Sequence, residues 1–176
     1  MGVGGRAWRV VRDLYRRVSS SVLFSDGHLS QPFDTNEGLR QGSVLSPLLF
    51  SIFIADVIDE WRRRGLGVRI GGRLLGGLLF ADDIVLIADT ADHLQQAMDI
   101  MSEHARRWRY RFSNSKCAVV VSGKQRATGR KWMLAGEEVE ERDEYKHLGL
   151  LIQKNGRWNQ WQEKRVRSGH GAKGAL

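Results

Sequence analysis

Apolar residues recur at helical spacing in the first part of the chain, and two helices are predicted there. Residues 6–17 carry arginines on one face and an apolar face made of Trp8, Val11, Leu14 and Tyr15. A second helix should begin at Ser46-Pro47, an N-cap residue followed by a proline at the first helical position, and end near Arg63. Its residues 48–54 are apolar on nearly all sides, which is typical of a buried helix.

A third helix is expected to follow the N-cap residue Thr90 and to end near Tyr110. Its spacing places one apolar face opposite a polar one, and that face is made of Leu94, Ala97, Met98, Met101, Ala105 and Trp108. Residues 157–166 are compatible with a further helix, but the glycines that follow indicate a frayed tail.

Short apolar runs separated by turn residues predict antiparallel strands. Residues 20–24 and 29–33 flank Asp26-Gly27, which is a strong hairpin signal. Residues 68–88 are expected to form another hairpin, interrupted early by two Gly-Gly pairs. Further strands are predicted at 117–122, at 132–134 and 138–139 around an Ala-Gly turn, and at 145–152. Helices mixed with hairpins indicate an α+β fold, an antiparallel sheet with helices packed on one face.

Composition narrows the class of protein. The chain has 176 residues, of which 41% are hydrophobic, so it can form one domain, or one domain and part of another. Its net charge of +8 favours a polyanionic partner. Its single cysteine, Cys117, is expected in the core, and it excludes a disulfide framework. We expect an intracellular, reducing location, nuclear or cytoplasmic, because no signal peptide or membrane-spanning segment is evident.

Two adjacent carboxylates, Asp82 and Asp83, lie inside the apolar run 78–87. Because burying an unpaired carboxylate is costly, this placement suggests that the pair holds a cation. Mg²⁺ binds one or two protein carboxylates and completes its shell with water and phosphates. The alternative is that both aspartates are turn residues that cap local amides. Phe80 is expected to anchor this hairpin in the core, and the small Ala81 leaves room beside the carboxylates.

Four motifs follow one another along the chain: GLRQGSVLSPLLF (38–50), FADD (80–83), Asn114-Ser115-Lys116 and YKHLG (145–149). Their order and spacing resemble those of reverse transcriptases of non-LTR (LINE-type) retrotransposons. Upstream, GVGG (2–5) with Trp8 and Leu14-Tyr15 matches the helix that follows the family's first palm motif. The match covers roughly residues 1–155 and implies a partial polymerase palm, with residues 156–176 as a truncated thumb start or a disordered tail.

The resemblance also implies roles for matching positions. Asp82 and Asp83 would bind two Mg²⁺ or Mn²⁺ ions, and Lys116 would reach the phosphates of the incoming dNTP. Gln41 and Gly42 would lie against the nucleotide and the RNA template, and Leu148 and Gly149 would hold the DNA primer. Each has a simpler interpretation: Gln41-Gly42 as a turn, Lys116 as a solvated lysine, and Tyr145 and Leu148 as strand core.

The family's third catalytic carboxylate, which lies before the first helix, has no counterpart in this sequence, nor do the fingers. We therefore expect weakened metal binding, no DNA synthesis by the isolated chain, and an exposed sheet edge that a segment of a longer chain would cover. The alternatives are a non-catalytic, basic nucleic-acid-binding remnant or a decayed product without function. Candidate phosphate contacts are Arg12, Arg16, Arg17, Arg62, Arg63, Arg64, Arg106, Arg107, Arg109 and Arg111.

Overall fold

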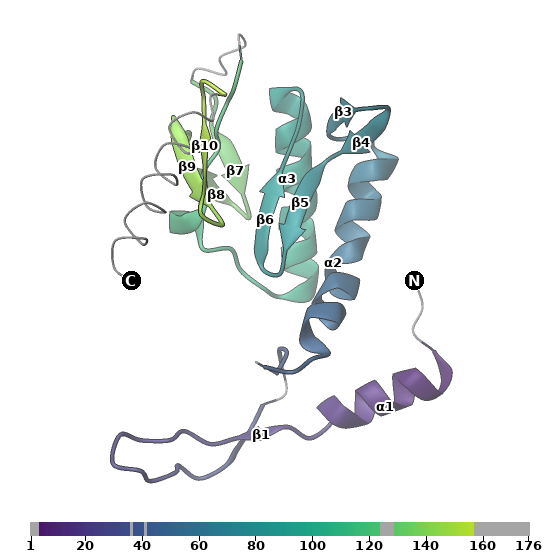
Figure 1. The fold of residues 1–176 in the computed structure, drawn as a ribbon, viewed down its shortest axis with the longest axis vertical. Helices are drawn as coiled ribbons and strands as arrows, with labels where there is room; N and C mark the ends of the chain where they lie inside the picture. Colours follow the sequence, from purple (N-terminus) through teal and green to yellow (C-terminus); the bar gives the residue numbers. More distant parts are fainter. Residues whose placement is uncertain (1–3, 36, 41, 124–128, 157–176) are drawn as a thin grey trace, which may run out of the picture. The chain divides into compact units, whose positions relative to one another are not determined.

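The computed structural model describes residues 4–35, 37–40, 42–123 and 129–156. The chain divides into two compact units, an N-terminal unit (Met1–Ala55) and a C-terminal unit (Asp56–Leu176), and each is described by itself. The described residues include helices and antiparallel two-stranded sheets, so the predicted mixture of α and β elements is confirmed (Figure 1). The strands form separate pairs and not the one antiparallel sheet that the sequence predicts. The possible helix at 157–166 and the tail lie outside the described residues.

The N-terminal unit contains α1 (Gly5–Tyr15), the strand pair β1 (Ser19–Ser20) and β2 (Phe33–Asp34), and the start of α2 (Ser46–Arg63). The predicted strands at 20–24 and 29–33 are wrong in extent, since beyond β1 and β2 they share only an isolated bridge between Leu23 and Leu29. Two residues interrupt the backbone hydrogen bonds between the strands there. The Ser30 hydroxyl accepts a hydrogen bond from the Val22 amide, and Pro32 has no amide hydrogen to donate.

The helix predicted from Ser46 to Arg63 is confirmed as α2, but its expected burial at 48–54 is only partly right. Ile54 is 4% exposed whereas Leu48 is 58% exposed, and Ile54 is the one buried apolar side chain among the described residues of the N-terminal unit. An apolar helix surface becomes buried only where another element covers it, and sequence periodicity does not reveal which sides are covered.

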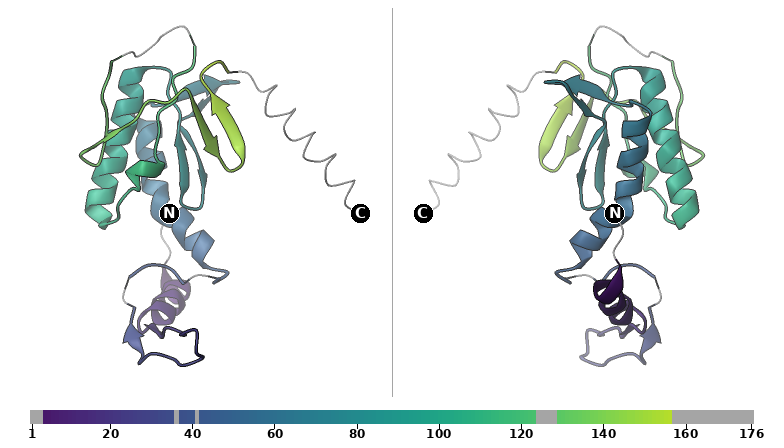
Figure 2. Two further views of the ribbon diagram at one scale, coloured as in Figure 1. Left: turned by 90° about the vertical axis from the view of Figure 1, so that its left-hand side faces the viewer. Right: turned by 90° about the vertical axis from the view of Figure 1, so that its right-hand side faces the viewer.

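The C-terminal unit holds most of the core. Helix α3 (Ala91–Trp108) contacts both β6 (Asp83–Leu86) and β7 (Trp132–Leu134), and it lies behind the β5–β6 hairpin in Figure 1 and to one side of it in Figure 2. The buried apolar side chains of this unit are Val57, Trp61, Leu66, Ala97, Met98, Met101, Ala105, Val119, Trp132, Leu134 and Val139. Thr90 caps α3 as predicted, since its hydroxyl accepts a hydrogen bond of 3.1 Å from the His93 amide. Trp108, which was expected on the apolar face of this helix, is 47% exposed.

Residues 68–88 form two hairpins instead of the single one predicted. Strands β3 (Val68–Ile70) and β4 (Arg73–Leu75) meet at Gly71-Gly72, and β5 (Gly77–Phe80) pairs separately with β6. Close packing explains the break between them. A Cβ on Gly77 would lie 2.6 Å from the Val85 carbonyl oxygen and 3.1 Å from the Trp61 ring, so only glycine fits where the hairpin crosses α2.

The last part of the chain also differs from its predicted strands. The turn at Ala135-Gly136 is confirmed between β7 and β8 (Glu137–Val139). The strand expected at 117–122 is reduced to one bridge between Val119 and Glu141, and Cys117 is only partly buried. Residues 145–152 are not one strand but a hairpin of β9 (Glu144–His147) and β10 (Leu150–Gln153). No described helix is long and apolar enough to cross a bilayer.

Candidate functional site

The two aspartates lie at the tip of the β5–β6 hairpin. Phe80 pairs with Asp83, so Ala81 and Asp82 form a two-residue turn. Ala81 has φ +51°, in the left-handed region that non-glycine residues seldom occupy. A strained residue at the turn indicates that the surrounding hairpin holds this tip in one conformation.

The expectation that Asp82, Asp83 and Phe80 lie in the core is wrong. Both aspartates are exposed, and Phe80 is 66% exposed. The strand register explains this, because Phe80 and its partner Asp83 share one face of the hairpin with Leu78, which is 52% exposed, whereas Leu79 and Ile84 are paired on the opposite, less exposed face. The apolar run therefore has an inner and an outer face, and the carboxylates are accessible from solvent.

The aspartates supply hard oxygen donors, which suit a divalent cation such as Mg²⁺. Among the described residues, no group of three or more His, Cys, Asp or Glu side chains could enclose a metal ion. A cation at Asp82 and Asp83 would therefore take its remaining ligands from water or from substrate phosphates. The residues present fit a partial, substrate-completed site and not a closed structural one.

Lys116 lies on the short 3-10 helix η1 (Asn114–Lys116), which is held from two sides. The Asn114 amide donates to Glu137 at 2.7 Å, and the Tyr145 hydroxyl donates to the Lys116 carbonyl oxygen. Two sequence motifs that lie far apart in the chain are thus bonded to each other, while the Lys116 side chain stays exposed. Sequence reasoning missed Glu137 and treated Tyr145 as strand core, and nothing in their local pattern indicates these contacts.

Leu148 and Gly149 form the two-residue turn of the β9–β10 hairpin. Both have positive φ, +47° and +79°, as a type I′ turn requires. Leu148 is an unusual residue at such a position, and its side chain is 55% exposed, so it is not the strand core that the simpler interpretation assumes.

Gly42 belongs to the N-terminal unit, and Gln41 lies outside the described residues. Gly42 is exposed with φ +78°, so glycine suits its backbone conformation. The loop before it is fixed by Ser46, whose hydroxyl donates to the Arg40 carbonyl oxygen at 2.7 Å and contacts the Tyr15 hydroxyl at 3.3 Å.

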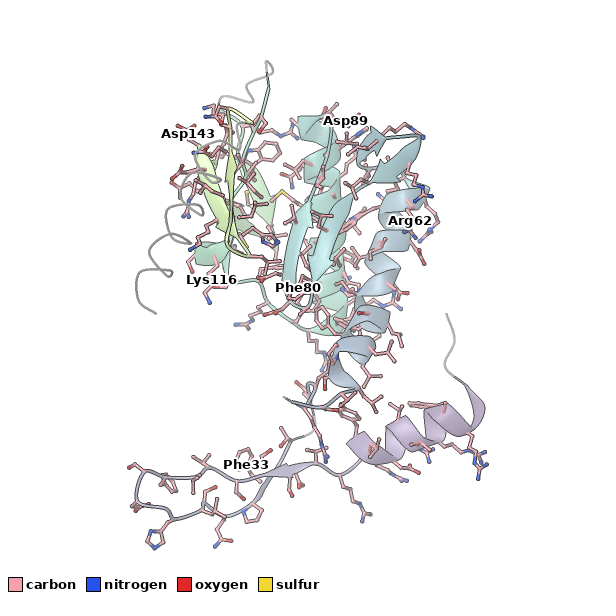
Figure 3. All side chains as sticks on the ribbon, viewed as in Figure 1. Phe33, Arg62, Phe80, Asp89, Lys116 and Asp143 are labelled. Atoms are coloured by element: carbon pink, nitrogen blue, oxygen red, sulfur yellow. The ribbon has the colours of Figure 1, made fainter. Side chains whose placement is uncertain are left out.

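Figure 3 places the labelled Phe80 and Lys116 at the same end of the C-terminal unit, with Asp89 and Asp143 at the opposite end. The aspartate turn follows Phe80 directly, so it lies at this end as well. The C-terminal unit therefore presents accessible carboxylates and an accessible lysine at one end, an arrangement suited to a ligand that carries both a cation and phosphates.

Comparison with known proteins identifies the protein family to which this chain belongs. Residues 6–152 match the family described as "Reverse transcriptase (RNA-dependent DNA polymerase)", and the chain belongs to this family. Its relatives confirm the resemblance to non-LTR elements. The chain is 30% identical over 129 residues to the Pol polyprotein of a type-1 R2 retrotransposable element from Nasonia vitripennis, a match over 68% of this chain and 12% of that protein.

Two further relatives extend this match. The Pol polyprotein of the type-2 element R2DM from Drosophila melanogaster is 29% identical over 156 residues, 84% of this chain and 15% of that protein. The RNA-directed DNA polymerase of the mobile element jockey from Drosophila funebris is 31% identical over 154 residues, 84% of this chain and 16% of that protein. The matches thus span only 12–16% of the length of these relatives.

Proposed function

We propose that this chain is part of the palm of a non-LTR reverse transcriptase, an RNA-directed DNA polymerase that extends a DNA primer on an RNA template. In this proposal residues 1–155 are the palm segment, and 156–176 are the start of a thumb or a tail. The observation that carries the proposal is the β5–β6 hairpin, whose tip presents Asp82 and Asp83 to solvent within the region that matches the family.

In this proposal Asp82 and Asp83 hold divalent ions, Mg²⁺ or Mn²⁺, which would stabilise charge on the reacting phosphates. Lys116 faces the phosphates of a dNTP, and the hydrogen bond from Tyr145 fixes the backbone that carries it. Leu148 and Gly149 lie against the primer, and Gln41 and Gly42 lie against the template and the nucleotide. The strained, exposed Leu148 supports a contact role, since such a side chain adds little to folding.

Metal binding by the chain tests the proposal directly. Mn²⁺ broadens NMR signals of nuclei near its site, so substoichiometric Mn²⁺ should broaden the backbone amides of residues 80–85. An internal control is present in the same sample, because Glu137 and Glu138 are another adjacent, exposed carboxylate pair beside a two-residue turn. The Asp82→Asn/Asp83→Asn double variant should abolish the broadening at 80–85.

Equal broadening around Glu137 and Glu138 would show that Mn²⁺ merely follows exposed carboxylates and would contradict the proposal.

Binding of primer–template separates the proposal from its alternative, a basic remnant without catalysis. A palm segment should bind a primed RNA template more tightly with Mg²⁺ present and lose that gain in Asp82→Asn. A basic remnant would bind with a steep salt dependence and no response to Mg²⁺.

A further inference from the structure

Arginine alternates with aromatic residues at the end of α3 and in the segment that follows it. In the structure the two kinds of residue differ in exposure. Tyr110 and Phe112 are partly buried, whereas the arginines between and before them are exposed. We call Arg107, Arg109 and Arg111 the arginine ridge. Beside it, the Trp108 ring is 47% exposed, with the Arg107 guanidinium 5.5 Å from its centroid.

The arginine ridge differs from Arg106 and from the cluster 62–64 in its electrostatic surroundings. Arg62, Arg63 and Arg64 each form an ion pair with Asp59 or Glu60, and Arg106 binds Glu103 through two nitrogens. Within the described parts of the chain, no ion pair or hydrogen bond is formed by the ridge side chains. Arg107 lies over the Trp108 ring and its charge also acts on Glu103, whereas the charges of Arg109 and Arg111 are left for a partner outside this chain.

Contacts between rings hold the segment that carries the ridge. The His104 ring lies 6.1 Å from Trp108 and 5.7 Å from Tyr110, and Tyr110 lies 5.4 Å from Phe112. His104 Nδ1 and the Tyr110 hydroxyl are also 3.0 Å apart, within hydrogen-bond distance. A ridge on such a fixed segment loses less conformational entropy when it binds a ligand than one on a free loop would.

Arg109 occupies a position where its own side chain is disfavoured. It ends α3 with φ +58°, and its amide donates to the Ala105 carbonyl oxygen. Glycine or asparagine is preferred at such a left-handed helix end. An arginine retained there is explained better by what its exposed guanidinium binds than by its effect on the helix.

We propose that the arginine ridge and Trp108 form a binding site for single-stranded nucleic acid. Guanidinium groups bind phosphates, and an exposed indole offers a surface on which an unpaired base can stack. The helix dipole alone does not account for the ridge, because Arg109 and Arg111 lie beyond the last turn of α3. The site lies outside the aspartate turn and requires no metal, so it stands or fails separately from the proposed polymerase function.

Anisotropy of a labelled oligo(dT) strand, with the full chain and EDTA present, measures the site. The triple variant Arg107→Gln/Arg109→Gln/Arg111→Gln should lose at least about tenfold in affinity and lower the salt slope by about two. A matched control, Arg62→Gln/Arg63→Gln/Arg64→Gln, removes the same charge from ion-paired positions and should change affinity less than about twofold. Equal losses in both triple variants would overturn the proposal, because the effect would then follow net charge alone.

Two single variants keep the test valid if the triple variant folds poorly. Arg109→Gly should raise thermal stability, since glycine accepts φ +58°, yet weaken binding. Trp108→Leu should weaken oligo(dT) binding about fivefold or more but leave an abasic strand of equal length unaffected. Undiminished oligo(dT) binding by Arg109→Gly, or equal effects of Trp108→Leu on both strands, would refute the site as described.

Discussion

Single residues with left-handed backbone conformations mark the exposed turns of this chain. Leu148 and Ala135 occupy the same position in two equivalent turns, each followed by glycine, with φ values of +47° and +52°. Asparagine is favoured at the first position of such turns. Leucine is therefore strained at 148, as expected if its side chain makes the primer contact proposed above.

Replacing Leu148 tests this interpretation. Leu148→Asn should stabilise the protein by about 1 kcal/mol, because asparagine tolerates the left-handed region better than leucine does. Urea unfolding measures the gain, and anisotropy with a primed RNA template should show weaker binding. Ala135→Asn is the matched control, with a similar gain in stability and unchanged binding. Parallel binding losses in the two variants would argue against a primer contact at Leu148.

Sequence reasoning at the residue level found the turn at Asp82 and Asp83 but not their exposure. The run 78–87 is apolar, and hydrophobicity alone suggests burial on both faces. Pairing of Phe80 with Asp83 decides which side chains face outward, and this register depends on contacts with α3 and α2 that no local pattern encodes. The hydrogen bond from Tyr145 to Lys116 also could not be predicted from a local pattern, since it joins residues distant in sequence.

At the scale of elements, the helices were predicted well because their signals are local. Helix α3 begins where Thr90 caps it, and it carries His104 and Trp108, whose rings contact one another and hold the segment beneath the arginine ridge. The hairpins were predicted less accurately, since their limits depend on close approaches such as Gly77 against Trp61. The cap residue and the periodicity of a helix can be recognised from residues close together in the sequence. The ends of a strand depend on contacts with residues far away in the sequence.

The cap of α3 gives a prediction at this scale. Thr90→Ala should destabilise the C-terminal unit by about 1 kcal/mol, because the His93 amide loses its acceptor. Thr90→Ser retains a hydroxyl and should cost much less. Thermal unfolding followed by circular dichroism measures both variants. Identical melting temperatures for the alanine and serine variants would show that the hydroxyl is not the stabilising group.

For the whole molecule, two surface ion pairs contribute to how stability depends on pH. A hydrogen bond from Arg64, with the charges of Arg63 and Arg64, lowers the pKa of Glu60 below its usual value, and a hydrogen bond from Arg106 lowers the pKa of Glu103. A carboxyl group with a lower pKa in the folded state binds protons more tightly when unfolded. Its contribution to stability is therefore complete above about pH 4.5 and declines as pH falls through the folded-state pKa.

A pH series should reveal this contribution. The urea midpoint of the wild type should fall between neutral pH and about pH 3, and Glu60→Gln/Glu103→Gln should make that fall shallower. The effect should be small, because these pairs are solvent-exposed and screened, and added salt should reduce it further. Superimposable pH profiles for the wild type and the double variant would exclude these two pairs as a source of acid sensitivity.

The buried Trp61 has a consequence for spectroscopy. Its side chain is fully buried, and its indole nitrogen finds no hydrogen-bond acceptor in the described structure, whereas the Trp132 nitrogen lies 3.3 Å from Glu141. A buried indole whose N–H makes no hydrogen bond emits at shorter wavelengths than a solvated one. Trp61 also contacts the glycine that begins the aspartate hairpin. Once the other five tryptophans are replaced by phenylalanine, its emission reports whether that hairpin is packed against α2, without any attached dye.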